Sequence, residues 1–557
     1  MSIAAGASER GAEPGAQRAM GAVSVPHVAV VGGGISGLAG AYRLRTLLGP
    51  EARITLVERS DRLGGVLRTV DMAGVPMDVG AEAFLARRPE VPALLRELGL
   101  AGELVHPSRA SATVRAGGRT RPLPARTLLG LPGGDTRLDG LLSPAGVARA
   151  AGERALPLDW SPGEDRSLGI LLRARYGDEV ADRLVEPLLS GVYAGRVDAL
   201  GLRATVPGLG AALDAGAASL TDAVDGLLPP PTDGPPAPVF GALRSGYGRL
   251  LAALRDGSGA DVRLGLPVRA LYRLDGAHRP GDGRDSGSAD GSDPRGGRGP
   301  AWRLEMGAAA GPERLDVDAV LLAVPAPALR TLLADVAPEA SRVADSVELA
   351  SPVVVALAYR ETDAAGLPDT SGVLIGADEP LHAKAFTHSA RKWPHLAPSA
   401  TDGLLRLRAS LGRAGSGGRP GSGGSGGAAE RGPGGAAERA AAALRVPDAE
   451  LVDRVRADLA TLTGITGPPV HAVVQRWGGG LPQYGVGHGE RMAALERAVA
   501  ELPGLAVAGA TLRGVGVPAC IGSGRAAAER IAAGLRRPEP SGRPAGSAAA
   551  GGGTMAV

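Results

Sequence analysis

Residues 27–44 read HVAVVGGGISGLAGAYRL, and this stretch decides the fold. Its apolar start predicts a short buried strand, and the residues from Ile35 onward predict a helix. Gly32, Gly34 and Gly37 have the G-x-G-x-x-G spacing. The first glycine permits a tight turn, the second lets the backbone approach a pyrophosphate, and the third lets helix and strand pack closely. The helix N-terminus would face the phosphate charge, so the stretch predicts a dinucleotide site.

A second predicted strand, Arg53–Glu58, ends in a carboxylate 21 residues after Gly37. A carboxylate at this point is placed to accept hydrogen bonds from a ribose. The glycine spacing alone is weak evidence in a chain with 87 glycines, and a chance match or a purely structural turn is the alternative. With strand, helix and Glu58 all in register, the dinucleotide interpretation is the stronger one.

The residues that follow Glu58 favour FAD over a nicotinamide cofactor. The sequence RLGG (62–65) comes almost at once, and DVGAE (78–82) follows it. Small residues there let the chain wrap around the flavin end of an extended cofactor, where a nicotinamide enzyme would normally begin another helix. An ordinary β-turn at residues 64–65 is the alternative.

Composition limits the class of protein. The 557 residues are enough for two or three domains, and a net charge of +3 argues against a nucleic-acid-binding protein. The single cysteine, Cys520, excludes an intrachain disulfide framework and a cysteine-built metal site, and it fits a reducing cytoplasm. We expect no metal site. No secretory signal or membrane span is visible, so we expect a cytoplasmic protein without integral membrane insertion, with loose membrane association left open.

Strand-like and helix-like segments alternate, which predicts an α/β chain whose nucleotide domain is assembled from distant pieces. The predicted strands include Val28–Val31, Arg53–Glu58, Val262–Leu264, Ala319–Val324, Val353–Tyr359 and Leu505–Gly509. Stretches rich in Gly, Pro, Ser and charge are predicted to be disordered at residues 1–24, 275–300, 412–440 and 537–557. The second stretch separates two strand-like runs, 268–274 and 301–306, and is predicted to be a long hairpin loop.

Three segments in and just after the glycine turn carry a family resemblance. GGGISGL (32–38), ERSDRLGG (58–65) and DVGAEAF (78–84) resemble the FAD-dependent porphyrinogen oxidases of haem biosynthesis, within the wider amine-oxidase-like flavoproteins. Further matches follow in the expected order: RPLP (121–124), RYGDEVADRLVEPLLSGVYAG (175–195), LPVRAL (266–271), AVPAPAL (323–329), KAFTHSARKWPHLAP (384–398), LPQYGVGH (481–488) and GATLRGVGVPACIGSG (509–524). The second and the last of these are specific to the oxidases.

The resemblance implies a mixed α/β fold of the amine-oxidase type in three parts. These are a Rossmann-type FAD-binding domain from residues 25–84, 244–335 and 490–536, a helical domain from 85–205, and a mixed-sheet substrate-binding domain from 206–243 and 336–489. Matching positions imply that Val66 and residues 80–83 line the cofactor, that the backbone of Val268 meets the adenine, and that Trp477 and residues 514–516 lie near the flavin. The predicted cofactor-binding residues are Gly32, Gly33, Gly34, Ile35, Ser36, Gly37, Glu58, Arg62, Gly64, Gly65, Val66, Gly80, Ala81, Glu82, Ala83, Val268, Trp477, Gly514, Val515 and Gly516.

The implied reaction is oxidation of a colourless porphyrinogen to a porphyrin. Six electrons leave in three flavin cycles, with O2 as the usual acceptor and hydrogen peroxide as the product. The sequence contains no Ser/His/Asp constellation, no HExxH motif, no paired catalytic carboxylates and no second strand-anchored glycine motif for NADPH. This fits chemistry in which the cofactor takes the hydride and the protein supplies orientation and electrostatics, so we assign no catalytic side chain.

Candidate substrate contacts come from the motif KAFTHSARKWPH. Only two of the 61 Lys and Arg residues are lysines, Lys384 and Lys392, and both lie in this motif. A compact ammonium differs from a guanidinium fork, so we hypothesise that one or both lysines bind substrate carboxylates. The alternative is that one is an ordinary surface lysine and the other occurs in the motif by chance. Trp393 is predicted to stack on the tetrapyrrole, with core packing as the alternative. Arg121 is a weaker candidate for carboxylate binding. A solvated loop arginine is the favoured interpretation for this residue.

The resemblance is nearest to the Gram-positive bacterial branch, which oxidises coproporphyrinogen III. The KWPH sequence supports this, as does Ala112, where plant-type relatives carry a substrate-binding arginine. Protoporphyrinogen IX, with two propionates in place of four, is the alternative substrate. An amine oxidase or carotenoid-type desaturase with the same FAD fold, and a non-catalytic porphyrin-binding protein, are further alternatives. Transient contact with other haem-pathway enzymes is left open.

Overall fold

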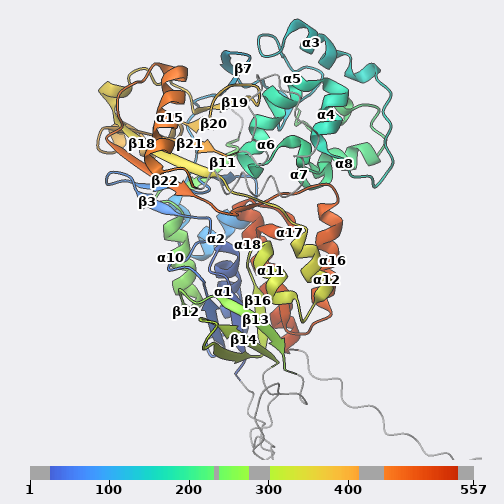
Figure 1. The fold of residues 1–557 in the computed structure, drawn as a ribbon, viewed down its shortest axis with the longest axis vertical. Coiled ribbons are helices and arrows are strands. Elements are labelled where there is room, and N and C mark those ends of the chain that lie inside the picture. Colours follow the sequence, from blue (N-terminus) through green and yellow to red (C-terminus); the bar gives the residue numbers. More distant parts are fainter. Residues whose placement is uncertain (1–24, 231–236, 275–300, 413–444, 537–557) are drawn as a thin grey trace, which may run out of the picture.

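The computed structural model describes residues 25–230, 237–274, 301–412 and 445–536. One half of the molecule contains a parallel sheet with its helices, and the other contains a larger sheet beside a group of short helices (Figure 1). We call the first half the parallel-sheet lobe. In the other half, we call the larger sheet with its packed elements the seven-strand lobe and the group of short helices the helical lobe. The predicted disorder of residues 1–24, 275–300, 413–440 and 537–557 concerns residues outside the described ranges.

The parallel-sheet lobe is organised around five strands in the order β12-β2-β1-β16-β24, all parallel. Their bounds are Asp261–Arg263 (β12), Arg53–Val57 (β2), His27–Val31 (β1), Ala319–Leu322 (β16) and Leu505–Val507 (β24). Side chains of β1 point alternately into two cores, Val28 and Val30 into one and Ala29 and Val31 into the other. Burial on both faces explains why the strand is apolar throughout. Five of the predicted strands are confirmed in this sheet.

Helices cover both faces of this sheet. On one face lie α1 (Ile35–Leu48), α2 (Glu90–Glu97), α10 (Tyr247–Ser258) and α18 (Val517–Arg536). On the other lie α11 (Ala326–Leu333), α12 (Pro338–Asp345), α16 (His488–Ala500) and a three-stranded sheet of β13 (Val268–Arg273), β14 (Trp302–Met306) and β15 (Glu313–Val317). A Cβ at Gly524 in α18 would overlap the carbonyl oxygen of Ser36 in α1. This glycine therefore brings the two helices close and joins the C-terminal motif to the glycine turn.

The seven-strand lobe is built on a sheet of order β22-β18-β21-β20-β19-β7-β8, antiparallel except between β19 and β7. Its strands are His471–Arg476 (β22), Val353–Arg360 (β18), Leu404–Leu411 (β21), Ala383–Thr387 (β20), Gly372–Ile375 (β19), Ala112–Ala116 (β7) and Arg119–Pro122 (β8). Helix α15 (Asp448–Thr463) packs on one face. The hairpin of β3 (Thr69–Asp71) and β4 (Pro76–Asp78) packs on the other. Its partner there is the side of β18 that carries Val354, Ala356 and Ala358.

The helical lobe has its own apolar core. Its helices are α3 (Pro144–Ala151), α4 (Leu168–Tyr176), α5 (Asp178–Val180), α6 (Glu186–Tyr193), α7 (Leu202–Thr205), α8 (Pro207–Asp214) and α9 (Leu220–Leu227). A buried carboxylate, Glu153, pairs with Arg175 and accepts backbone N–H groups of Leu220 and Thr221. The remaining short strands are β5 (Phe84–Leu85), β6 (Leu104–Val105), β9 (Thr127–Leu128), β10 (Leu131–Pro132), β11 (Phe240–Leu243), β17 (Leu349–Ala350) and β23 (Leu481–Pro482).

The lobes differ from the predicted domain ranges in two places. Strands β7 and β8 fall within the predicted helical domain, 85–205, but belong to the seven-stranded sheet, where β7 pairs with β19 and β8 pairs with β7. Helices α8 and α9 fall within the predicted substrate domain but pack in the helical core. The predicted ranges came from the family resemblance, whereas a strand is placed by the partner that completes its hydrogen bonds. The other domain boundaries stay predictions.

Among the described residues, no helix combines the length and the apolar composition that crossing a membrane requires. The described residues also contain no group of three or more His, Cys, Asp or Glu side chains suited to a metal ion.

Strands β13 and β14 test the hairpin prediction directly. They pair antiparallel, with Arg273 opposite Trp302, and the N–H of Leu274 donates to the carbonyl of Ala301 at 2.8 Å. The two strand ends that flank residues 275–300 are therefore held together by their own hydrogen bonds. A two-residue turn has the geometry to join such a pair.

Replacing residues 275–300 by Asn-Gly should leave the free energy of unfolding within about 0.5 kcal/mol of the parent value, because no ladder hydrogen bond is lost. Thermal and urea unfolding of the two proteins measure this. A loss of cooperative unfolding in the shortened protein would show that the segment contributes to the fold.

Candidate functional site

The turn between β1 and α1 is closed by two glycines that have no room for a side chain. Gly32 has φ of +104°, and a Cβ there would overlap the carbonyl oxygen of Ala323. A Cβ at Gly37 would overlap the carbonyl oxygen of Gly32. The middle glycine differs, because a Cβ at Gly34 would meet no heavy atom within 4 Å. Gly34 therefore faces open space, which is what a pyrophosphate approaching the backbone requires.

Helix α1 begins at this open space without a side-chain cap. Gly34 is its N-cap residue and no side chain accepts a hydrogen bond from the first turn. Ile35 and Ser36 are buried, so the first turn is held by packing. The uncapped N–H groups and the positive end of the helix dipole form an anion site. These features fit the diphosphate of a dinucleotide.

Glu58, at the end of β2, is tied into the same turn. One carboxylate oxygen accepts the N–H of Gly33 at 2.7 Å, and the other accepts the N–H and hydroxyl of Ser60 at 2.9 and 2.7 Å. Each carboxylate oxygen has two lone pairs, so the oxygen facing Gly33 retains one for a ribose hydroxyl. The N–H of Leu266 donates to the carbonyl of Glu58 at 3.0 Å, which brings the start of β13 and Val268 to the same side.

The RLGG sequence forms a loop beside the glycine turn. Gly64 and Gly65 have φ of +108° and +57°, and the N–H of Gly64 donates to the carbonyl of Gly33 at 2.8 Å. Arg62 donates to the carbonyls of Leu63, Gly65 and Leu67. The guanidinium thus holds the loop in shape, and the ring of Trp477 lies 5.8 Å from it.

The segment 79–83 forms the next wall. A Cβ at Gly80 would overlap the carbonyl oxygen of Val66, and the indole N–H of Trp477 donates to the carbonyl of Val79 at 3.0 Å. Val66 itself is 41% exposed. The structure therefore brings Val66, Gly80 and Trp477 together, although they are far apart in the sequence. Ala81 is exposed, and Ala83 packs against the small apolar cluster around Trp393.

The C-terminal glycines lie between α17 (Ala510–Arg513) and α18. Gly514 has φ of +128°, and its N–H donates to the hydroxyl of Tyr484 at 2.7 Å. Val515 packs against the helical core, and a Cβ at Gly516 would have only Pro518 near it. Burial raises the pKa of the Cys520 thiol to about 11. Tyr484 was not predicted from the sequence as a site residue, although it lies in the LPQYGVGH motif.

The profile of the family "flavin containing amine oxidoreductase" matches residues 35–532 of this sequence. The chain belongs to this family. It is therefore an oxidoreductase with FAD as its cofactor, and the glycine turn, Glu58 and the open space at Gly34 are fitted to that dinucleotide.

Two curated relatives carry more specific names. A protein named coproporphyrinogen III oxidase from Mycobacterium tuberculosis is 42% identical over 505 residues, covering 90% of this chain and 97% of its own. Its namesake from Bacillus subtilis is 30% identical over 518 residues, with the same coverage of 90% and 97%. The match to both extends over nearly their whole length.

Solved structures agree with the fold. A structure titled putative protoporphyrinogen oxidase, from Exiguobacterium sp. 255-15, has a TM-score of 0.71 at 28% identity and covers 92% of this chain and 99% of its own. Cyclohexylamine oxidase from Brevibacterium oxydans has a TM-score of 0.61 at 14% identity, covering 92% and 100%. The second likeness shows a shared fold alone.

Three of the four predicted substrate residues contact other parts of the chain. Lys392 forms an ion pair with Glu82 at 2.8 Å, and the indole N–H of Trp393 donates to the same carboxylate at 2.6 Å. Lys384 is buried and donates to the carbonyl of Ser190 at 3.0 Å, in the last turn of α6. Arg121 lies exposed on β8. Trp393 is 1% exposed and fills a small apolar core. This environment agrees with core packing, the alternative to stacking on the tetrapyrrole.

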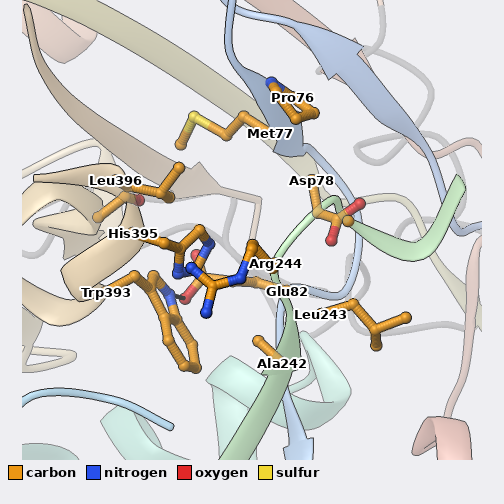
Figure 2. Close-up of a pocket in the computed structure, with 12 residues that line it drawn as sticks. Pro76, Met77, Asp78, Glu82, Ala242, Leu243, Arg244, Trp393, His395 and Leu396 are labelled. Carbon is orange, nitrogen blue, oxygen red and sulfur yellow. Dashed lines mark hydrogen bonds between the residues drawn. The ribbon is translucent and has the colours of Figure 1, made fainter. Parts of the chain in front are cut away.

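A small polar cavity lies beside this cluster. Asp78, Glu82, Arg244, Trp393 and His395 are among its lining residues (Figure 2). Its volume of about 20 Å³ suits one water molecule. Burial raises the pKa of Asp78 to about 7. The hydrogen bonds that it accepts from Thr69 and from the N–H of Tyr247 lower the pKa, but burial outweighs them. No pattern in the sequence indicates a buried titrating group at this position.

Two glycine variants separate packing from cofactor binding. Gly37→Ala should lower the free energy of unfolding by about 3 kcal/mol, because its Cβ overlaps a carbonyl oxygen. Gly34→Ala should preserve unfolding but raise the dissociation constant of FAD about tenfold or more, since its Cβ occupies the open space. Thermal unfolding and flavin titration of the apoprotein measure both. A Gly34→Ala protein with parent FAD affinity would contradict this placement of the diphosphate.

Asp78 should make stability depend on pH. Its pKa is raised, so the folded state favours the protonated carboxyl, and this contribution is lost as the pH rises through about 7. Thermal unfolding between about pH 5 and 8 should show a midpoint that falls up to about pH 7 and then levels off, and Asp78→Asn should flatten that slope because the amide cannot ionise. Asp71→Asn, at the exposed end of the same hairpin, is the matched control. An unchanged slope in Asp78→Asn would exclude this carboxyl as its origin.

Proposed function

We propose that the protein oxidises coproporphyrinogen III to coproporphyrin III, using FAD and O2 and releasing hydrogen peroxide. The observation that carries the proposal is the 42% identity to a coproporphyrinogen III oxidase over 97% of that relative's length. We call the glycine turn, Glu58 and the wall of Val66, Gly80 and Trp477 the flavin cradle. It supports the proposal, because Gly34 leaves open space for the diphosphate of FAD.

Bound FAD supplies the hydride acceptor, and the residues of the chain bind and orient it. The overall reaction balances when the porphyrinogen loses six hydrogen atoms and three O2 molecules become three H2O2. The α1 N-terminus would hold the diphosphate and Glu58 the ribose, and the wall of Val66, Gly80 and Trp477 would lie toward the flavin end. We assign no general base.

Protoporphyrinogen IX is the competing substrate. A bovine protoporphyrinogen oxidase is 28% identical over 536 residues, less than the bacterial coproporphyrinogen III oxidases from Mycobacterium. Both lysines of the KAFTHSARKWPH motif have partners within the chain, so the proposed substrate is argued from the relatives and not from these lysines. An amine oxidase, the alternative reaction, is supported by the description of the family and by fold likenesses at 14 to 17% identity. A cytoplasmic location and transient contacts with other haem-pathway enzymes stay predictions from the sequence.

A direct comparison of the two porphyrinogens tests the function. The purified flavoprotein should convert coproporphyrinogen III with a kcat/KM about tenfold or more above that for protoporphyrinogen IX. Porphyrin fluorescence, O2 consumption and peroxide release measure the reaction together. A preference for protoporphyrinogen IX would overturn the substrate, and flavin bleaching by an amine but by neither porphyrinogen would overturn the reaction.

A further inference from the structure

The carboxylate of Glu82 is the centre of a buried ion cluster. It accepts the Nζ of Lys392 at 2.8 Å and the indole N–H of Trp393 at 2.6 Å, and its second oxygen lies 2.8 Å from the Nε of Arg408. Figure 2 shows Glu82 and Trp393 in the same pocket. Lys392 and Trp393 follow β20, and Arg408 lies on β21. Glu82 therefore joins segment 79–83 to two elements of the seven-strand lobe.

Arg408 also holds the backbone of this segment. Its Nη1 donates to the carbonyls of Asp78 and Gly80 at 2.9 and 3.0 Å. Two residues earlier on the same face of β21, Arg406 donates to the carbonyls of Met72 and Ala73 at 3.0 Å each. Two arginines thus fix the β3–β4 hairpin and the residues after it to the sheet. A planar guanidinium can serve several acceptors at once, which an ammonium cannot do in the same geometry.

The charges explain why the cluster is tight. Burial alone would raise the pKa of Glu82, but the positive charges of Arg408 and Lys392 outweigh burial and lower it to about 2. The ammonium of Lys392 lies 5.0 and 5.5 Å from the ring centres of Trp393 and Phe240. The positive charge of this ammonium is therefore compensated within the chain by two aromatic faces and one carboxylate. Removing the carboxylate would leave two poorly solvated cations facing each other.

The Glu82 cluster is connected to the flavin cradle through Gly80, which Arg408 holds and which packs against Val66. Gly65 packs against Gly34, Val66 follows Gly65, and the carbonyl of Val66 fits against Gly80 only because Gly80 has no side chain. The position of Gly80 is set in turn by Arg408. A shift of segment 79–83 would therefore be transmitted to the wall that contains Val66 and Trp477.

We propose that Glu82 is a positioning residue that fixes segment 79–83 against the seven-strand lobe through Lys392, Trp393 and Arg408, and so sets the wall of the flavin site. Lys392 acts within this cluster as the counter-charge of Glu82, not as a ligand of the substrate. The inference depends on the flavin site and is independent of which porphyrinogen is oxidised.

Four variants of the full-length holoprotein test it. Glu82→Gln keeps the shape and removes the charge, and Arg408→Lys keeps the charge and removes the fork. Lys392→Met and the double variant Glu82→Gln/Lys392→Met complete a double-mutant cycle. Glu529→Gln, in the exposed pair with Arg43, is the control. The readouts are the dissociation constant of FAD, the visible spectrum of bound flavin, and separate KM and kcat values for the porphyrinogen.

Glu82→Gln and Arg408→Lys should each raise the FAD dissociation constant about tenfold or more and alter the flavin spectrum. Lys392→Met should raise it less and leave KM unchanged. The double variant should bind FAD better than Glu82→Gln alone, because the excess positive charge has been removed. Glu529→Gln should match the parent. If Glu82→Gln does not fold, Arg408→Lys and Lys392→Met still give the same comparison.

Two results would overturn the proposal. One is parent FAD affinity and spectrum in both Glu82→Gln and Arg408→Lys. The other is a raised KM in Lys392→Met with unchanged FAD binding, which would make that lysine a substrate ligand. Additive effects of Glu82→Gln and Lys392→Met would count against the coupling between them.

Discussion

The close approach of helix α1 to strand β1 is the constraint on which the rest of the molecule depends. The carbonyl oxygen of Gly32 occupies the place where a side chain at Gly37 would begin, so the helix approaches the strand this closely only with glycine at this position. The same approach leaves Gly34 facing open space at the mouth of the helix dipole. Helix α18 then packs on α1 at Gly524, and this contact brings the C-terminal glycine motif to the same side as the glycine turn. The glycine turn and the C-terminal motif are therefore positioned by the same helix.

The parts of the fold that could be predicted are those encoded by neighbouring residues. The β1–α1 turn, Glu58 at the end of β2, and the strands on either side of residues 275–300 all follow from short patterns, and the structure contains each of them. Periodicity and glycine spacing report local geometry, and local geometry is sufficient there. The cofactor could be predicted for the same reason.

The remaining features depend on pairs distant in sequence. The partner of β7 is β19, some 260 residues later, and a single sequence contains no signal for that pairing. Glu82 and Arg408 are 326 residues apart, and each alone resembles an ordinary surface charge. One pattern could have indicated them: Arg406 and Arg408 alternate with Leu405 and Leu407 in a strand whose other residues, apart from Ser410, are apolar. A buried arginine needs a hydrogen-bond acceptor, and backbone carbonyls accept from both of these arginines.

The environment of Cys520 has a practical consequence for spectroscopy. It is the chain's single cysteine, and its sulfur lies beneath the C-terminal glycines, 3.8 Å from the carbonyl oxygens of Gly514 and Val515. Because burial holds the pKa of this thiol near 11, almost none of it is thiolate at neutral pH, and maleimide reagents have little to attack. A cysteine introduced on an exposed surface would therefore be labelled selectively in the otherwise native sequence. Distances between the lobes could then be followed with fluorescent or spin probes without first removing a native thiol.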